Sequence, residues 1–66
     1  MVDRDEIVAL VALRGQATPL DLAADLGLMT TRDKIAIGGT LARLVADGRL
    51  AVGDAWQGQK TYEVPA

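Results

Sequence analysis

The side chains that carry most enzyme chemistry are absent from this 66-residue sequence. It contains no histidine, cysteine or serine, so imidazole and thiolate metal ligands are excluded, and a threonine nucleophile would lack its usual base. Five of the seven aspartates recur from residue 21 onward without a metal-ligand spacing, and each sits where a helix cap, a first-turn acid or a turn residue is expected: Asp21, Asp25, Asp33, Asp47 and Asp54. We therefore expect no enzyme activity, no metal, no cofactor and no small-molecule substrate.

Basic and hydroxyl side chains in the second half of the chain are a stronger functional signal. Cations neutralise phosphates, while hydroxyl groups and a helix N-terminus supply short hydrogen bonds to them. The candidate phosphate-binding residues are Thr30, Thr31, Arg32, Lys34, Thr40, Arg43 and Lys60. The alternative is that these cations are ordinary solvated surface, partly offset by Asp33 and Asp47.

A glycine-bearing segment near the C-terminus holds the single tryptophan, Trp56, beside two amides and a lysine. An indole at a loop tip can pack against sugars or in a protein pocket, and Gln57, Gln59 and Lys60 can reach a minor groove or phosphates. Alternatively, Trp56 folds back over a core whose other large aromatic side chain is Tyr62. The segment is a candidate binding loop under the first interpretation only.

Two short helices are predicted in the first half of the chain. Asp3 and Glu6 have the spacing of a capping box, and apolar residues then recur at helical intervals as far as Gly15, which predicts a helix from Arg4 to Arg14. After an extended link at Gln16 and Ala17, Thr18 can cap a second helix. That helix is expected from Pro19 to Leu26, with Leu22, Ala23 and Leu26 inward and Gly27 as its stop.

A third helix and a β-hairpin are predicted in the second half. Thr30 and Thr31 compete as N-cap of the helix, whose inward stripe is Ile37, Leu41, Leu44 and Val45 and whose stop is Gly48. Residues 50–52 are apolar and residues 61–64 alternate polar and apolar side chains, with a glycine-bearing loop at residues 53–59 between them, which predicts two antiparallel strands. The link at Gln16 and Ala17 could pair with them as a short third strand.

Most of the chain resembles the winged helix-turn-helix domains of small bacterial and phage regulators. The residues that carry the resemblance are 7–15, 18–23 and 26–28 in the first half, and 41–50, where two leucines and a glycine lead into the hairpin. The resemblance implies an α+β fold in a single domain over residues 1–66, with three helices followed by a two-stranded antiparallel β wing. It further implies a DNA-binding transcriptional regulator or architectural factor that uses the third helix and the wing on double-stranded DNA, as a homodimer or a cooperative array.

Two features depart from the family pattern. Gly27 and Leu41 are 14 residues apart, four more than is typical, so the extra segment near residues 29–34 either lengthens a turn or adds a helical turn. Gly38 and Gly39 would weaken a helix by about 1 kcal/mol each relative to alanine. They allow either close approach of the backbone to a phosphate or partner, or a kink, or a helix that begins only after Gly39.

The charge balance and the outer face of the third helix favour a second hypothesis, a protein-docking module. The net charge of −2 opposes binding by phosphate contacts alone. The outward positions Ile35, Ala36, Gly39, Ala42 and Ala46 carry no group that reads a base edge and would suit a protein partner or a second copy. No apolar run approaches the roughly 20 residues of a membrane span and the N-terminus is acidic, so we expect a cytoplasmic protein.

Overall fold

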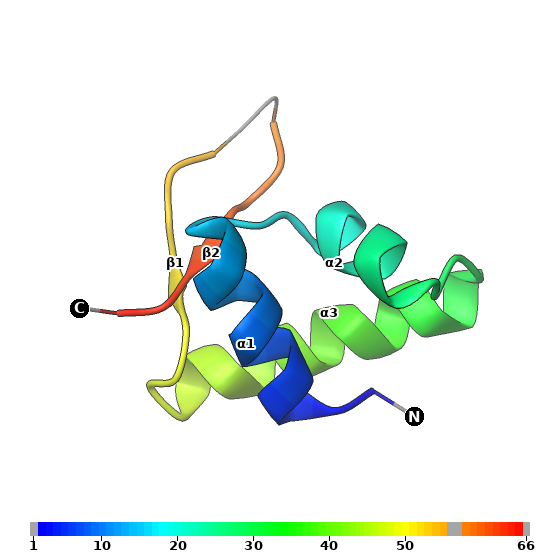
Figure 1. Cartoon of the computed structure of the whole chain (residues 1–66), viewed down its shortest axis with the longest axis horizontal. Helices are drawn as coiled ribbons and strands as arrows, with labels where there is room; N and C mark the ends of the chain where they lie inside the picture. Colours follow the sequence, from blue (N-terminus) through cyan, green and yellow to red (C-terminus); the bar gives the residue numbers. More distant parts are fainter. Residues whose placement is uncertain (1, 56–57, 66) are drawn as a thin grey trace.

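Three helices followed by a two-stranded antiparallel sheet make up the structure, a computed structural model that describes residues 2–55 and 58–65. The elements are α1 (Arg4–Arg14), α2 (Pro19–Leu26), α3 (Thr31–Ala46), β1 (Ala51–Val52) and β2 (Tyr62–Glu63) (Figure 1). This is the α+β order that the sequence predicts. The predicted roles of Trp56 and Gln57 lie outside the described residues.

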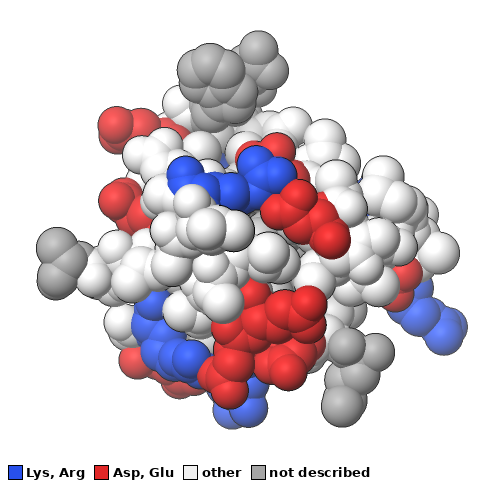
Figure 2. Space-filling model, viewed as in Figure 1, with Lys and Arg blue, Asp and Glu red and all other residues white. Residues whose placement is uncertain are grey.

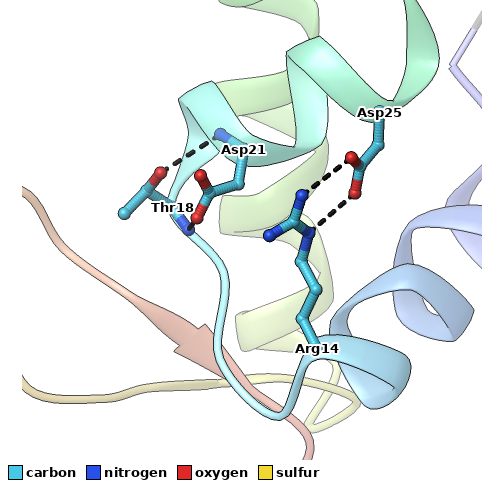
Figure 3. Close-up of polar contacts among 4 residues, drawn as sticks. All are labelled: Arg14, Thr18, Asp21 and Asp25. Atoms are coloured by element: carbon cyan, nitrogen blue, oxygen red, sulfur yellow. Dashed lines mark hydrogen bonds and ion pairs between the residues drawn. The ribbon is translucent and has the colours of Figure 1, made fainter.

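Side-chain caps fix the starts of α1 and α2 where the sequence predicts them. The Asp3 carboxylate accepts hydrogen bonds from the backbone N–H groups of Asp5 and Glu6, at 2.9 and 3.4 Å. At α2 the Thr18 hydroxyl accepts from the Asp21 N–H and the Asp21 carboxylate accepts from the Thr18 N–H, both at 3.1 Å (Figure 3). These bonds satisfy N–H groups that would otherwise lack a partner in the first turn.

Helix α3 is one continuous helix that runs through the paired glycines. Thr30, rather than Thr31, is its N-cap, since the Thr30 hydroxyl accepts from the Asp33 N–H at 3.1 Å. The extra segment therefore adds helix in front of the glycines, and the alternative of a helix that begins only after Gly39 is wrong. Ile37 and Leu41 are fully buried on either side of the glycines, so tertiary packing holds the helix where its local propensity is weakest.

The hairpin is shorter than the sequence predicts, because regular pairing is limited to Ala51 with Glu63 and Val52 with Tyr62. The extended link does pair with the sheet. Ala17 and Tyr62 exchange two backbone hydrogen bonds, of 3.0 and 2.8 Å, as an isolated antiparallel bridge. Strand β2 thus lies between β1 and the segment that precedes α2.

The core is assembled from small aliphatic side chains of all three helices and the start of the hairpin. Its buried members are Ile7, Val11, Ala17, Leu22, Ala23, Ile37, Leu41, Leu44 and Leu50. Leu26 and Val45, which were expected to face inward, are only partly buried and pack against this core, as does Tyr62.

Candidate functional site

A groove of about 440 Å³ separates the start of α2, the first turns of α3 and the hairpin. It is lined by Pro19, Leu20, Lys34, Gln59, Lys60 and Tyr62. Three of the residues proposed from sequence, Lys34, Gln59 and Lys60, thus share one groove, although Lys34 is far from the other two in the chain. The groove is the candidate functional site.

The walls of the groove are held by backbone structure. Pro19 is the first residue of α2, directly after the Thr18 cap. Tyr62 is in β2 and is fixed by its two backbone hydrogen bonds to Ala17. Both walls are therefore tied to the segment that joins α1 to α2, and the two lysines at the groove are exposed.

The apolar walls are the part of the site that sequence analysis missed. Leu20 is 49% exposed, and Pro19 and Tyr62 are half-buried. Their only sequence signal is that Leu20 is a large apolar residue outside the inward stripe of its helix. Only the tertiary structure brings it into one groove with Tyr62.

Ion pairing divides the basic residues into two sets. Arg14 binds Asp25 through two hydrogen bonds, of 2.7 and 2.8 Å (Figure 3), and Arg49 binds Asp5 at 2.7 Å. The remaining basic residues form no ion pair with any residue in the described part of the chain: Arg4, Arg32, Lys34, Arg43 and Lys60. All of these except Arg4 belong to α3 or the hairpin loop, where cations were expected to bind phosphate.

The Arg14 guanidinium also holds the pKa of Asp25 below its ordinary value, chiefly through the hydrogen bonds, against an opposing effect of desolvation and with a smaller contribution from its charge. The pair links the last turn of α1 to α2 (Figure 3). Arg14 and Asp25 therefore have a structural partner in each other, and neither lines the groove.

Charge is distributed unevenly between the helices. Helix α3 has a net charge of +2, from Arg32, Lys34 and Arg43 against Asp33 (3 − 1). Helix α2 has a net charge of −2, from Asp21 and Asp25. On the face that α1 crosses, acidic side chains gather in the lower part of the view and basic side chains are interspersed with them (Figure 2). The overall negative charge is thus not shared by α3.

The predicted cations of α3 lie on two sides of the helix. Lys34 and Arg43 are nine residues apart, about two and a half turns, and so point in roughly opposite directions. Arg32 and Arg43 are 11 residues apart, about three turns, and share a side. The structure brings Lys34 together with Lys60 at the groove and places Arg32 and Arg43 on the other flank.

Between these two flanks α3 presents a surface of small and apolar residues. Ile35, Gly39, Ala42 and Ala46 are all exposed there, and so is Ala36 beside Arg43. None of these side chains donates or accepts a hydrogen bond, as the sequence predicts. The outer face of α3 therefore allows close approach of a flat surface but offers no side-chain recognition of a base edge.

The three threonines proposed to bind phosphate, Thr30, Thr31 and Thr40, differ in what their hydroxyl groups already contact. The Thr30 hydroxyl caps α3, and the Thr40 hydroxyl donates to the Ala36 carbonyl at 2.9 Å within the helix. Thr31 is exposed in the first turn. Thr31 is thus better placed than Thr40 to offer a hydroxyl to a ligand.

Within residues 2–55 and 58–65, no group of three acidic side chains is arranged to hold a metal ion. None of the helices described is both long and apolar enough to cross a membrane. Comparisons of the chain with known protein families, with curated proteins and with solved structures found no match.

Proposed function

We propose that this chain is a winged helix-turn-helix domain that binds double-stranded DNA, as a transcriptional regulator or an architectural accessory factor. The proposal rests mainly on one observation: Lys34 of α3 and Lys60 of the hairpin share one groove, and neither has an ion-pair partner among the described residues. The order of helices and hairpin, with the hairpin acting as a wing, is in keeping with it.

The distribution of cations around α3 supports a docking mode. A helix in the major groove has a phosphate backbone on each side of it. Lys34, with Lys60 beyond it, would meet the phosphates on one side, and Arg32 with Arg43 those on the other. The small residues between them would let the helix approach the base pairs closely, so Gly39 and Ala42 fit this mode.

Binding in this mode is governed by the DNA backbone. The outer face of α3 has no side-chain donors or acceptors for bases, so phosphate contacts would supply most of the affinity and sequence selectivity would be weak. The net charge of −2 reduces non-specific attraction, but the local charge of α3 is +2 (3 − 1). Affinity should therefore fall steeply as salt is added.

Fluorescence anisotropy with a labelled duplex tests the proposal across a salt series from about 50 to about 200 mM. Replacing Lys34 or Lys60 by glutamine should weaken binding to all sequences alike and lower the salt slope by about 1 for each residue. Arg4→Gln is the matched control, because it removes one exposed positive charge from α1, outside the groove.

Two results would contradict the proposal. Absence of binding to any duplex at about 50 mM salt, where phosphate-driven binding is strong, would rule out the function itself. An equal loss in Arg4→Gln and in the two lysine variants would show that net charge, and not the groove, controls affinity.

The exposure of Ile35 supports a second candidate function, docking of a protein partner or a second copy on α3. Ile35 is 71% exposed and adjoins Gly39 and Ala42 on a surface without charge. Under this hypothesis Ala42→Glu abolishes self-association in sedimentation velocity while the domain stays folded. If the wild-type chain is monomeric at all concentrations and binds DNA, this second hypothesis is not needed.

A further inference from the structure

The apolar walls of the groove have no role in the proposed contact with DNA. A DNA phosphate can bind the lysine ammonium groups and the side-chain amide of Gln59. It makes no favourable contact with the apolar side chains of Pro19, Leu20 and Tyr62. These three residues form hydrocarbon and aromatic surface that remains accessible beside two cations. The combination indicates a ligand that is anionic at one end and apolar at the other.

The size of the groove limits what that ligand can be. A volume of about 440 Å³ lies within the range of roughly 300–1,000 Å³ that is usual for small-molecule sites. Such sites are mostly apolar, with a few polar groups that fix the orientation of the ligand. The groove has this composition, and its walls are pre-formed by the Thr18 cap and the bridge between Ala17 and Tyr62.

We propose that the groove binds a small organic anion, a carboxylate or phosphate ester with a ring-sized apolar body. The anionic group lies between the ammonium groups of Lys34 and Lys60, and the body packs against Leu20 and Tyr62. Charge complementarity selects the anion, since neither lysine is neutralised by a described carboxylate. This inference does not depend on the proposed DNA binding, because it is drawn from the apolar walls, which the DNA contact does not use, although both proposals use Lys34 and Lys60.

Titrations of the full chain followed by ¹⁵N–¹H correlation spectra test the inference with three probes. Phenyl phosphate carries both the ring and the anion, inorganic phosphate the anion alone, and phenol the ring alone. We expect saturable shift changes with phenyl phosphate at the amides of residues 20, 34, 59, 60 and 62. Its dissociation constant should be at least tenfold lower than that of either other probe.

Variants separate the two halves of the site. Lys34→Gln combined with Lys60→Gln should weaken phenyl phosphate binding at least tenfold, whereas Arg4→Gln should leave it unchanged. Leu20→Ser should weaken phenyl phosphate binding and leave the affinity for inorganic phosphate as it was. Because Leu20 is half exposed, this variant should keep the wild-type pattern of amide signals, which reports that it is folded.

Three outcomes would overturn the inference. Inorganic phosphate that binds as tightly as phenyl phosphate would reveal a plain anion site, and phenol that binds as tightly would reveal a plain apolar site. Shift changes located away from the groove would place the ligand elsewhere. None of these measurements contains DNA, so failure of the DNA proposal and failure of this one are distinguishable.

Discussion

At the scale of single residues, the basic side chains of this protein divide by whether a carboxylate already holds them. Arg14 contacts Asp25 through two parallel hydrogen bonds, from Nε and one Nη to the two carboxylate oxygens, a geometry that suits a guanidinium and a carboxylate. Lys34 and Lys60 have no such partner among the described residues. The first kind of residue joins two helices, and the second is available to a ligand.

The Arg14–Asp25 pair should make stability depend on pH. The folded-state pKa of Asp25 is lowered, so its contribution is complete above the unfolded-state value of about 3.9 and is lost as the pH falls through the folded-state value. Asp25→Asn should therefore lower the urea midpoint at pH 6, and its difference from wild type should shrink at lower pH. Both side chains are partly exposed, so a modest effect is expected.

Asp54→Asn is the control for this measurement, because Asp54 is exposed and its carboxylate forms no ion pair among the described residues. Its urea curve should overlap that of the wild type at pH 6. A difference between Asp25→Asn and wild type that stays constant with pH would mean that the charge of Asp25 does not contribute.

At the scale of elements, the paired glycines lower the intrinsic helix propensity of α3. Gly38 and Gly39 lie within it without positive φ angles, and a β-carbon added at either would meet nothing within 4 Å. Their presence is thus not required by the fold. It is consistent with a role in binding, where the absence of a side chain brings the helix backbone closer to a partner.

Substitution of both glycines by alanine distinguishes stability from binding. Gly38→Ala with Gly39→Ala should raise the free energy of unfolding, by about 1 kcal/mol for each residue. If the glycines allow close approach to DNA, the same double variant should bind the duplex more weakly although it is more stable. Chemical denaturation and anisotropy measure the two effects separately.

Gly27→Ala is the comparison for this experiment, because Gly27 has a φ of 69° at the end of α2, in a region that alanine avoids. It should be destabilising. Unchanged DNA binding by the more stable glycine variant would assign Gly38 and Gly39 no functional role.

At the scale of the whole molecule, stability depends on a few aliphatic side chains. The largest fully buried side chains are isoleucines, leucines and a valine. In a domain below about 70–80 residues such a core rarely supplies more than about 3–5 kcal/mol. Loss of one central side chain should therefore remove most of the stability.

Leu41→Ala tests whether the free energy of unfolding is as small as this. Leu41 is completely buried in α3, and truncation of a buried leucine removes about 2–5 kcal/mol. Circular dichroism should show a chain that is largely unfolded at 37 °C. Ile35→Ala, which removes a large apolar side chain from the exposed face of the same helix, should melt as the wild type does.

The sequence by itself determined the elements of this protein. Helix starts were predictable because caps such as Asp3 and Thr18 act on N–H groups two or three residues away, and helix ends because Gly15 and Gly27 adopt conformations that other residues avoid. Most of the core followed from apolar periodicity. Local interactions decide these features, so the chain order alone carries the information.

Only the tertiary structure decided which residues that are distant in the chain contact one another. The choice of Thr30 over Thr31 as cap and the continuity of α3 through its glycines depend on packing of Ile37 and Leu41. Pairing of Arg14 with Asp25 depends on how α1 and α2 are placed and rotated relative to each other. The groove likewise arises because Ala17 binds Tyr62 and brings the hairpin beside Leu20, a long-range contact that no local pattern of residues records.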